Sequence, residues 1–375
     1  MNDPRESSPS AFPASVTAPV SREVWTPASV DELADAVRSS ARAIAVGGGT
    51  KPRLAQVGGD VARISTAKLR GIVDYKPGEF TFTARAGTPV REIAAALADR
   101  GQHLPFDPVL VDAGTTLGGT VAAGVCGPGR FRPGGLRDFI LAVQFVDGAG
   151  RRLRMGGKVV KNAAGFDLPK FFVGSIGRFG VLTELTFKVF PRPAATRTLR
   201  LVARDAAAKM RLMTEAAGER WEIDALETAA DDDSVLVRLA GPAAALDLLQ
   251  AGILARWTGS ILASPEADNL WLGAREFRWA HEGGTLVKAA LTPTQVPAFA
   301  ECVRMTAGAR GWIGAGGNVG YLSLPAGTPC PPLAWPAMAL RGDAPLWPGP
   351  SARFEVMRAV KRALDPENRF PALDE

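Results

Sequence analysis

Histidine and cysteine are scarce in this sequence, and their scarcity excludes several kinds of site. Only two histidines, His103 and His281, occur among the 375 residues, so imidazole metal sites and histidine proton relays have few groups available. The three cysteines, Cys126, Cys302 and Cys330, lie far apart and form neither a disulfide framework nor a CxxC pattern. We therefore expect no metal site and a reducing compartment.

Long apolar runs are also missing. No stretch approaches the roughly 18 to 20 apolar residues that a membrane-spanning helix needs. The N-terminal segment is rich in Pro, Ser and Ala and lacks a lysine-flanked apolar core, so we expect residues 1–21 to be a disordered lead-in.

The composition is that of a globular protein. Hydrophobic residues make up 46% of the chain and charged residues 22%, which allows a sizeable core, and 375 residues suggest two domains. Forty-four Lys and Arg against 38 Asp and Glu leave a net charge of +6, spread along the chain without a long basic block. This balance weakly favours an anionic ligand, and no nucleic-acid partner is expected.

The first half of the chain predicts alternating helices and strands. Residues 28–38 start with Ser29 as an N-cap and carry Glu32 three positions later, a capping box that predicts a helix. Residues 42–46 then form a buried strand that leads into Gly47. Further strands are expected at 62–66, 71–75, 79–87, 137–146, 149–154 and 181–190, with a hairpin turn at Asp147-Gly148 and a helix at 90–101. Pro191 and Pro193 end the last of these strands and predict a domain boundary near residue 193.

The second half repeats one order of elements. A strand, a helix, two strands and a helix are followed by a strand, a helix and two strands, which suggests a ferredoxin-like α+β domain. The expected strands are 198–203, 225–230, 234–241, 284–291, 311–316 and 319–325, and the expected helices are 206–221, 243–257 and 294–304. The proline-rich stretch 325–350 is expected to be a linker or irregular loop, and a last helix should end at Asp365-Pro366.

Three glycine-rich stretches carry the strongest functional signal. They are AVGGGT (Gly47 to Thr50), GTTLGGTVAAG (114–124) and GGKVVKNAAGFD (156–167). Glycines after a strand let backbone N–H groups approach one phosphate-bearing ligand, and nearby cations add charge. A single glycine triplet is more often only a tight turn, but three such stretches together suggest a nucleotide cofactor. Neither the GxGxxG fingerprint nor a GxxxxGK[ST] loop is present.

In sequence, these stretches resemble the vanillyl-alcohol oxidase type of flavoprotein, whose FAD domain is called PCMH-type. AVGGGTK resembles the family's first pyrophosphate loop, TLGGTVAAG its second flavin loop and GSIGRFGVLTEL its closing turn. The resemblance covers roughly residues 22–193. GGKVVKNAAGFDLPK, together with QHLPFDP and GPGRFRPGGLRDF, is most similar to the FAD-binding subunits of glycolate oxidase complexes.

The resemblance implies an α+β fold and a set of cofactor contacts. Residues 22–193 would form the PCMH-type FAD-binding domain of two α+β subdomains, 194–350 a ferredoxin-like α+β cap that includes the proline-rich linker, and 351–375 a C-terminal helix returning to the FAD domain. The implied cofactor-binding residues are Gly47, Gly48, Gly49, Thr50, Lys51, Thr116, Gly118, Gly119, Asp138, Lys158, Lys161, Asn162 and Val181.

Several positions depart from the family's pattern. The glycine loop ends in Thr50 where members that bond FAD covalently often carry His, so FAD is expected to be held noncovalently. Val46 stands where many relatives have Arg, and Phe166 replaces the commoner Tyr of the KNxxGYD pattern. The cap contains only one histidine, His281, from which a metal-assisted hydroxy acid site is hard to build.

For several single polar residues, both a functional and a structural role are open. His281 is a weak candidate for a base near the flavin. A lone histidine in such a segment is more often a surface or loop residue. Arg275 is a weak candidate for binding a substrate carboxylate, but with Glu276 it could equally form a pair on a helix face. Lys158 and Lys161 have the best context for phosphate contact, with a solvated lysine pair as the alternative.

Three functions follow from the resemblance. The first is an FAD-binding subunit of a complex that oxidises glycolate or another 2-hydroxy acid, passing electrons from the flavin to a partner. The implied partners are a larger FAD-binding oxidase subunit and an iron–sulfur subunit. The alternatives are a noncatalytic assembly subunit that keeps the flavin fold and a stand-alone flavin oxidase of another small alcohol. The expected location is the cytoplasm, with peripheral attachment to the inner membrane through the complex as an alternative.

Overall fold

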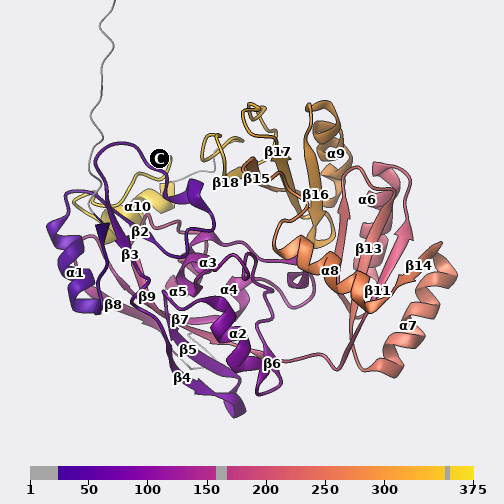
Figure 1. Ribbon diagram of the computed structural model, residues 1–375, viewed down its shortest axis with the longest axis horizontal. Helices are drawn as coiled ribbons and strands as arrows, with labels where there is room; N and C mark the ends of the chain where they lie inside the picture. Colours follow the sequence, from indigo (N-terminus) through magenta and orange to yellow (C-terminus); the bar gives the residue numbers. More distant parts are fainter. Residues whose placement is uncertain (1–23, 158–166, 351–354) are drawn as a thin grey trace, which may run out of the picture.

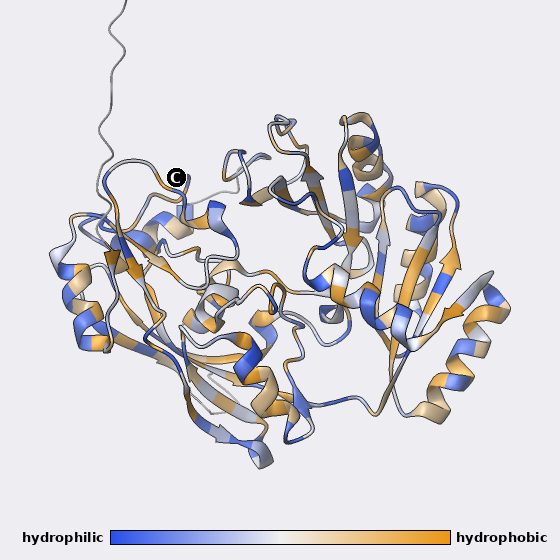
Figure 2. Cartoon of the chain, viewed as in Figure 1, coloured by the Kyte–Doolittle hydropathy of each residue, from blue (hydrophilic) through white to orange (hydrophobic). Residues whose placement is uncertain are grey.

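The computed structural model describes residues 24–157, 167–350 and 355–375. Figure 1 shows two lobes, and we define them by residues: the N-terminal unit comprises the described residues up to 193, and the eight-stranded unit comprises residues 194–350. Strands and helices are mixed in both, which confirms the predicted α+β class. Figure 2 shows that apolar residues run along the strands in both units.

The N-terminal unit contains two main sheets. A small parallel sheet has the order β1-β3-β2, and a five-stranded antiparallel sheet has the order β4-β5-β9-β7-β8. Their strands are β1 (Val24–Trp25), β2 (Ala43–Val46), β3 (Ala62–Ser65), β4 (Ile72–Lys76), β5 (Thr81–Arg85), β7 (Ile140–Val146), β8 (Arg152–Gly156) and β9 (Val181–Lys188). A two-stranded pair joins β6 (Gln102–His103) to β10 (Phe190–Pro191).

Local signals explain where the first helix begins. In α1 (Val30–Ser39), the Ser29 hydroxyl accepts the Glu32 N–H at 3.1 Å, and the Glu32 carboxylate accepts the Ala28 N–H at 2.8 Å. This confirms the predicted helix. The Glu32 carboxylate, however, accepts the N–H of Ala28, the residue before the N-cap, whereas in a capping box it would accept the N–H of the N-cap itself. The apolar face of α1 packs on Ile64, Val146 and other core residues, so the helix joins the two sheets.

The other helical segments of this unit are short. They are α2 (Val90–Ala98), α3 (Leu117–Ala123), α4 (Leu136–Phe139) and α5 (Leu168–Phe171), with the 3-10 turns η1 (Pro52–Ala55), η2 (Pro77–Glu79) and η3 (Pro128–Arg130). The predicted hairpin at Asp147-Gly148 is confirmed: the Asp147 carboxylate accepts the N–H groups of Ala149 and Arg151 and closes the turn between β7 and β8.

The predicted strand over 137–146 was wrong for its first three residues. Residues 137–139 belong to α4, because the Asp138 carboxylate accepts the Gly135 N–H at 2.8 Å and fixes a helical turn. The strand starts only at Ile140.

The eight-stranded unit contains two related halves in one antiparallel sheet. Its strand order is β14-β11-β13-β12-β16-β17-β15-β18. The first half has the βαββαβ order and the 4-1-3-2 strand arrangement of a ferredoxin-like fold, and the second half repeats it without the second helix. The halves meet where β12 pairs with β16. The strands are β11 (Ala195–Val202), β12 (Ile223–Ala229), β13 (Ser234–Gly241), β14 (Gly259–Leu262), β15 (Thr285–Ala290), β16 (Arg310–Gly314), β17 (Val319–Leu324) and β18 (Ala337–Arg341).

The two faces of this sheet have different neighbours. Helices α6 (Ala206–Gly218), α7 (Ala243–Arg256) and α9 (Val296–Met305) cover one face, where Val237, Val287 and Leu322 belong to one core. The opposite face packs on α8 (Ser264–Arg275) and on the N-terminal unit. Because side chains alternate along a strand, each strand of this sheet presents one set of residues to the helices and another to the N-terminal unit.

Three elements of this unit were not predicted. The strand β18 lies inside the proline-rich stretch that was expected to be a linker or irregular loop, and it pairs with β15 along the edge of the sheet. A short apolar run at 337–340, between proline-rich segments, is its sequence signal. Helix α8 and strand β14 were not assigned, although Ser264-Pro265-Glu266 is a typical helix start.

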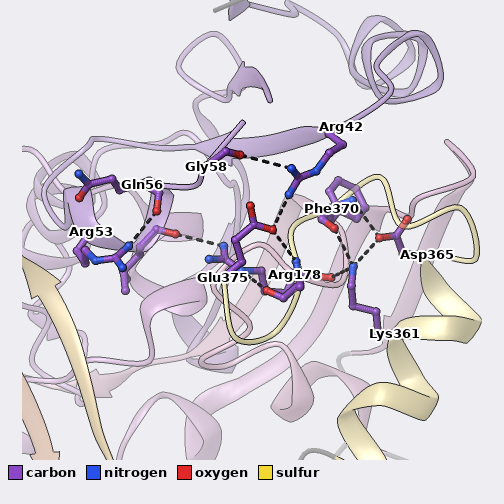
Figure 3. Close-up of polar contacts among 11 residues, drawn as sticks. Arg42, Arg53, Gln56, Gly58, Arg178, Lys361, Asp365, Phe370 and Glu375 are labelled. Atoms are coloured by element: carbon purple, nitrogen blue, oxygen red, sulfur yellow. Dashed lines mark hydrogen bonds and ion pairs between the residues drawn. The ribbon is translucent and has the colours of Figure 1, made fainter. Parts of the chain in front are cut away.

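The C-terminal segment returns to the N-terminal unit. Helix α10 (Glu355–Leu364) ends in a buried ion pair in which the Lys361 ammonium donates to the Asp365 carboxylate at 2.6 Å (Figure 3). The same ammonium donates to the carbonyls of Arg178 at 3.0 Å and Phe370 at 3.1 Å. Asp365 is fully buried and also accepts the Phe370 N–H. These bonds fasten the last turn of the chain onto the N-terminal unit.

None of the helices in the described part of the chain is long and apolar enough to cross a membrane.

We expect Asp365→Ala to lower the free energy of unfolding by roughly 3–5 kcal/mol, because it leaves the buried Lys361 ammonium without its counter-ion. A urea titration followed by far-UV circular dichroism measures the change. Asp35→Ala is the matched control: Asp35 pairs with Arg38 on the exposed face of α1, so its loss should change stability by less than about 1 kcal/mol. Equal effects of the two substitutions would contradict a structural role for the buried pair.

Candidate functional site: a glycine-lined cavity

The N-terminal unit contains a cavity of about 290 Å³. It lies where the loop after β2, the start of α3 and the turn before β9 meet. Its walls come from residues 45–52, Leu54, Ala55, Arg63, Thr66, Ala86, Thr115, Gly118, Gly119, Ala122, Ala123, 175–177, Gly180 and Leu182. All the described residues that line it therefore belong to the N-terminal unit.

Two glycine loops approach so closely that side chains would not fit between them. A Cβ at Gly48 would lie 2.1 Å from the carbonyl oxygen of Gly114, and a Cβ at Gly47 would lie 2.4 Å from the Thr116 hydroxyl. A Cβ at Gly118 would lie 2.8 Å from that of Ala86. These glycines leave backbone amides at the cavity wall, which is the kind of surface that binds phosphate groups.

Thr116 shapes the second loop. It is the N-cap of α3, and its hydroxyl accepts the Gly119 N–H at 3.3 Å. Gly124 ends the helix with a φ of 62°, a conformation that glycine adopts without steric penalty. The helix is thereby held between two fixed ends, with Gly118 and Gly119 at the cavity.

Lys51 is a buried cation on the cavity wall. Its side chain is 8% exposed, and its ammonium donates to the hydroxyls of Thr50 and Thr115, each at 3.2 Å. Burial lowers the pKa of Lys51 to about 8, and the more distant Glu276 carboxylate offsets part of that shift. No carboxylate among the described residues forms an ion pair with this ammonium.

Most of the cofactor contacts implied by the sequence gather here. Gly47, Gly48, Gly49, Thr50, Lys51, Gly118 and Gly119 all line the cavity, and Thr116 lies directly behind Gly47. Their individual contacts with a cofactor stay predictions.

Two other candidates lie away from the cavity wall. The Asp138 carboxylate caps α4, as described above, and the Val181 side chain is fully buried in the core beside α1. Its neighbour Gly180 lines the cavity instead. Lys158, Lys161 and Asn162 lie outside the described residues.

The weak catalytic candidates belong to the eight-stranded unit and are not on the cavity wall. The His281 ring lies 2.8 Å from the Gly308 carbonyl oxygen, and Arg275 lies 3.5 Å from the Asp107 carboxylate. Glu276 accepts the N–H groups of Val111 and Asp112. Arg275 and Glu276 thus connect the two units, whereas the His281 contact lies within the eight-stranded unit. The described part of the chain contains no cluster of three or more His, Cys, Asp or Glu that could hold a metal ion.

Sequence reasoning missed several cavity residues. Arg63 on β3 is the second cation of the wall, and no motif signals it. Ser175, Ile176 and Gly177 lie within the GSIGRFGVLTEL stretch, which could have indicated them because it was identified as a flavin-contacting turn.

A buried group of charged side chains connects the two units. Arg238 on β13 pairs with Asp224 at 2.5 Å and with Asp107 of the N-terminal unit at 3.6 Å. Asp107 also accepts the Gly129 N–H at 2.9 Å. Beside this group, Glu227 accepts the indole N–H of Trp312 at 2.5 Å, and burial raises the pKa of its carboxyl to about 8. Glu227 is therefore mostly protonated at neutral pH.

The comparisons with known proteins agree with a flavin site. Residues 22–156 match the family model described as FAD binding domain. Over 131 residues the chain is 51% identical to the Escherichia coli (strain K12) protein named glycolate oxidase subunit GlcE, and the match covers 35% of this chain and 37% of that protein. It is 31% identical over 131 residues to glycolate oxidase subunit GlcD of Bacillus subtilis (strain 168), covering 35% of this chain and 28% of that protein.

A D-lactate dehydrogenase of Anaerostipes hadrus is 32% identical over 161 residues, which is 43% of this chain and 32% of that protein. The matches thus span about a third of the length of these curated relatives. Among solved structures, alkyldihydroxyacetonephosphate synthase is similar in fold, with a TM-score of 0.66, 14% identity, and coverage of 92% of this chain and 76% of that one. The resemblance to the FAD-binding subunits of glycolate oxidase complexes and the predicted FAD-binding fold are both confirmed.

The residues of the cavity fit FAD. The glycine loops keep Cβ atoms out of the wall, and Lys51 and Arg63 supply positive charge for a diphosphate. The chain thus contains an FAD binding domain, and FAD is its cofactor. The bound flavin would supply the redox chemistry, while the protein binds and orients it.

We expect Gly48→Ala to lower the FAD content of the purified protein and to destabilise it by about 1–3 kcal/mol, because the added Cβ collides with the Gly114 carbonyl. Flavin absorbance per protein and a thermal melt measure both effects. Gly58→Ala is the control, since a Cβ there meets nothing within 4 Å. A Gly48→Ala protein with normal flavin content would show that the two loops can move apart.

We expect Glu227→Gln to remove part of the pH dependence of stability. The folded protein must keep a proton on Glu227 that the unfolded chain releases above a pKa of about 4.5, so wild-type stability should fall by on the order of 2–3 kcal/mol between pH 5 and pH 7. Glutamine can still accept the Trp312 N–H but does not ionise. Urea titrations at pH 5, 6 and 7 should give similar stabilities at pH 5 and a more stable variant at pH 7. Parallel curves would mean that Glu227 does not titrate in this range.

Proposed function

We propose that this chain is the FAD-binding subunit of a complex that oxidises glycolate or another 2-hydroxy acid, and that its flavin passes electrons to a partner subunit. The observation that carries the proposal is the 51% identity to a protein named as a glycolate oxidase subunit, together with a cavity that fits FAD. Named relatives that are D-lactate dehydrogenases support 2-hydroxy acids as the substrate class.

The charges around the cavity support a division of labour between subunits. Oxidation of a hydroxy acid needs a base that takes the hydroxyl proton close to the flavin. The ionisable side chains that the described residues contribute to the wall are Lys51 and Arg63, and both suit the diphosphate of the cofactor. His281 and Arg275 make contacts elsewhere. We therefore propose that substrate oxidation depends on a larger FAD-binding oxidase subunit.

An iron–sulfur subunit would take the electrons. The three cysteines of this chain are far apart in sequence, and none belongs to a cluster-binding pattern. The proposed location is the cytoplasm, with peripheral attachment to the inner membrane through the complex.

We propose the domain division 22–193, 194–350 and 351–375. The main sheets support it, since each of them lies within one of the first two segments, and so does the packing of α10 on the N-terminal unit. FAD held noncovalently and flavin contacts by Lys158, Lys161 and Asn162 are part of the same proposal.

Anaerobic titration with glycolate tests this function. The purified chain should carry FAD, and its visible flavin absorbance should stay unchanged when glycolate is added. After assembly with the other subunits of the complex, the flavin of this chain should be reduced by glycolate. Reconstituting this chain with a flavin analogue of shifted absorbance distinguishes its flavin from that of the partner.

Each other result points to a different function. Bleaching of the isolated chain would show a complete substrate site and a stand-alone oxidase. A flavin that stays oxidised in the complex, while the partner's flavin is reduced, would indicate an assembly subunit. A chain that neither contains nor binds flavin would contradict the proposal altogether.

A further inference from the structure

Lys51 is a buried cation of the N-terminal unit whose hydrogen-bond partners are neutral. Its ammonium donates only to two hydroxyls among the described residues, those of Thr50 and Thr115. By comparison, the buried Lys361 has the carboxylate of Asp365 at 2.6 Å. Burying a cation without a counter-ion is costly, so the Lys51 site is incomplete as it stands.

The surroundings of Lys51 do not supply the missing charge. Arg63 on β3 lines the same cavity and adds a second positive charge. Among the described residues, the carboxylate that acts on Lys51 is that of Glu276, at the end of α8, and it already accepts the N–H groups of Val111 and Asp112. On the side of α3, the Thr115 hydroxyl faces the hydroxyl of Thr120 at 3.3 Å, which is also neutral.

We infer that FAD binding is coupled to proton uptake from solvent by the Lys51 amine, because the diphosphate becomes the counter-ion that this buried side chain lacks among the described residues. This inference rests on the proposed cofactor contact of Lys51. The proton adds to the lone pair of Nζ, and no other bond changes. FAD affinity is then regulated by pH through a single residue of the cavity wall.

The sign of the effect follows from linkage. Without cofactor, burial holds the pKa of Lys51 near 8, so about three quarters of the molecules carry a neutral amine at pH 8.5 and almost none at pH 6.5. An adjacent diphosphate favours the charged form and raises the pKa of Lys51. FAD binding should therefore take up about three quarters of a proton at pH 8.5 and almost none at pH 6.5. The affinity should fall by about tenfold between pH 7 and pH 9.

Isothermal titration calorimetry of FAD into the flavin-free full-length chain tests the inference. Titrations in buffers of different ionisation enthalpy, at pH 6.5 and pH 8.5, give the number of protons taken up. Lys51→Arg keeps a permanent charge and should bind FAD with no proton uptake at this site and with little change in affinity from pH 7 to pH 9. Lys51→Met should lose the uptake and bind FAD more weakly at pH 7.

Lys68→Met is the matched control, because Lys68 is exposed in the same unit and is not on the cavity wall. It should keep the wild-type proton uptake and affinity. Equal uptake at both pH values in the wild type, or unchanged uptake in Lys51→Met, would overturn the inference and leave the function standing. Failure of the wild type to bind FAD at any pH would instead contradict the proposed function.

Discussion

The cavity depends on the close approach of two glycine loops. Gly47 and Gly48 follow β2, and they lie against Gly114 and Thr116 at distances that no side chain would permit. This contact places the backbone amides of both loops on one wall and brings α3 next to the small parallel sheet. The rest of the site follows from it, because Lys51 reaches Thr115 only when the loops lie together.

The eight-stranded unit packs on the N-terminal unit through one face of its sheet. Along β12, Leu226 faces the core under the helices, while Glu227 faces the N-terminal unit. Along β15, Val287 faces that core and Lys288 donates to the Gly124 carbonyl at the end of α3. Alternation along the strands thus gives the sheet an apolar core on one side and polar contacts to the cofactor-binding unit on the other.

The sequence predicted those features that local physics determines. The helix after Ser29 could be predicted from its N-cap. The two glycine loops could be predicted because clustered glycines indicate a place where two backbone segments approach closely. Arg63 could not be predicted as part of the site, since its place on the wall results from how β3 pairs with its neighbours. Asp138 was placed wrongly in a strand because its carboxylate stabilises a local helical turn that competes with strand formation.

The C-terminal segment is connected to the cavity wall through Arg178. A buried, unneutralised cation destabilises the flavin-free protein, so other contacts must hold the wall in place. Arg178 supplies such contacts: it donates to the carbonyls of Leu54 and Ile176, both on the wall, and to that of Ala372 in the C-terminal segment. Lys361 in turn donates to the Arg178 carbonyl. The last residues of the chain thus stabilise a cavity whose described wall residues all lie in its first half.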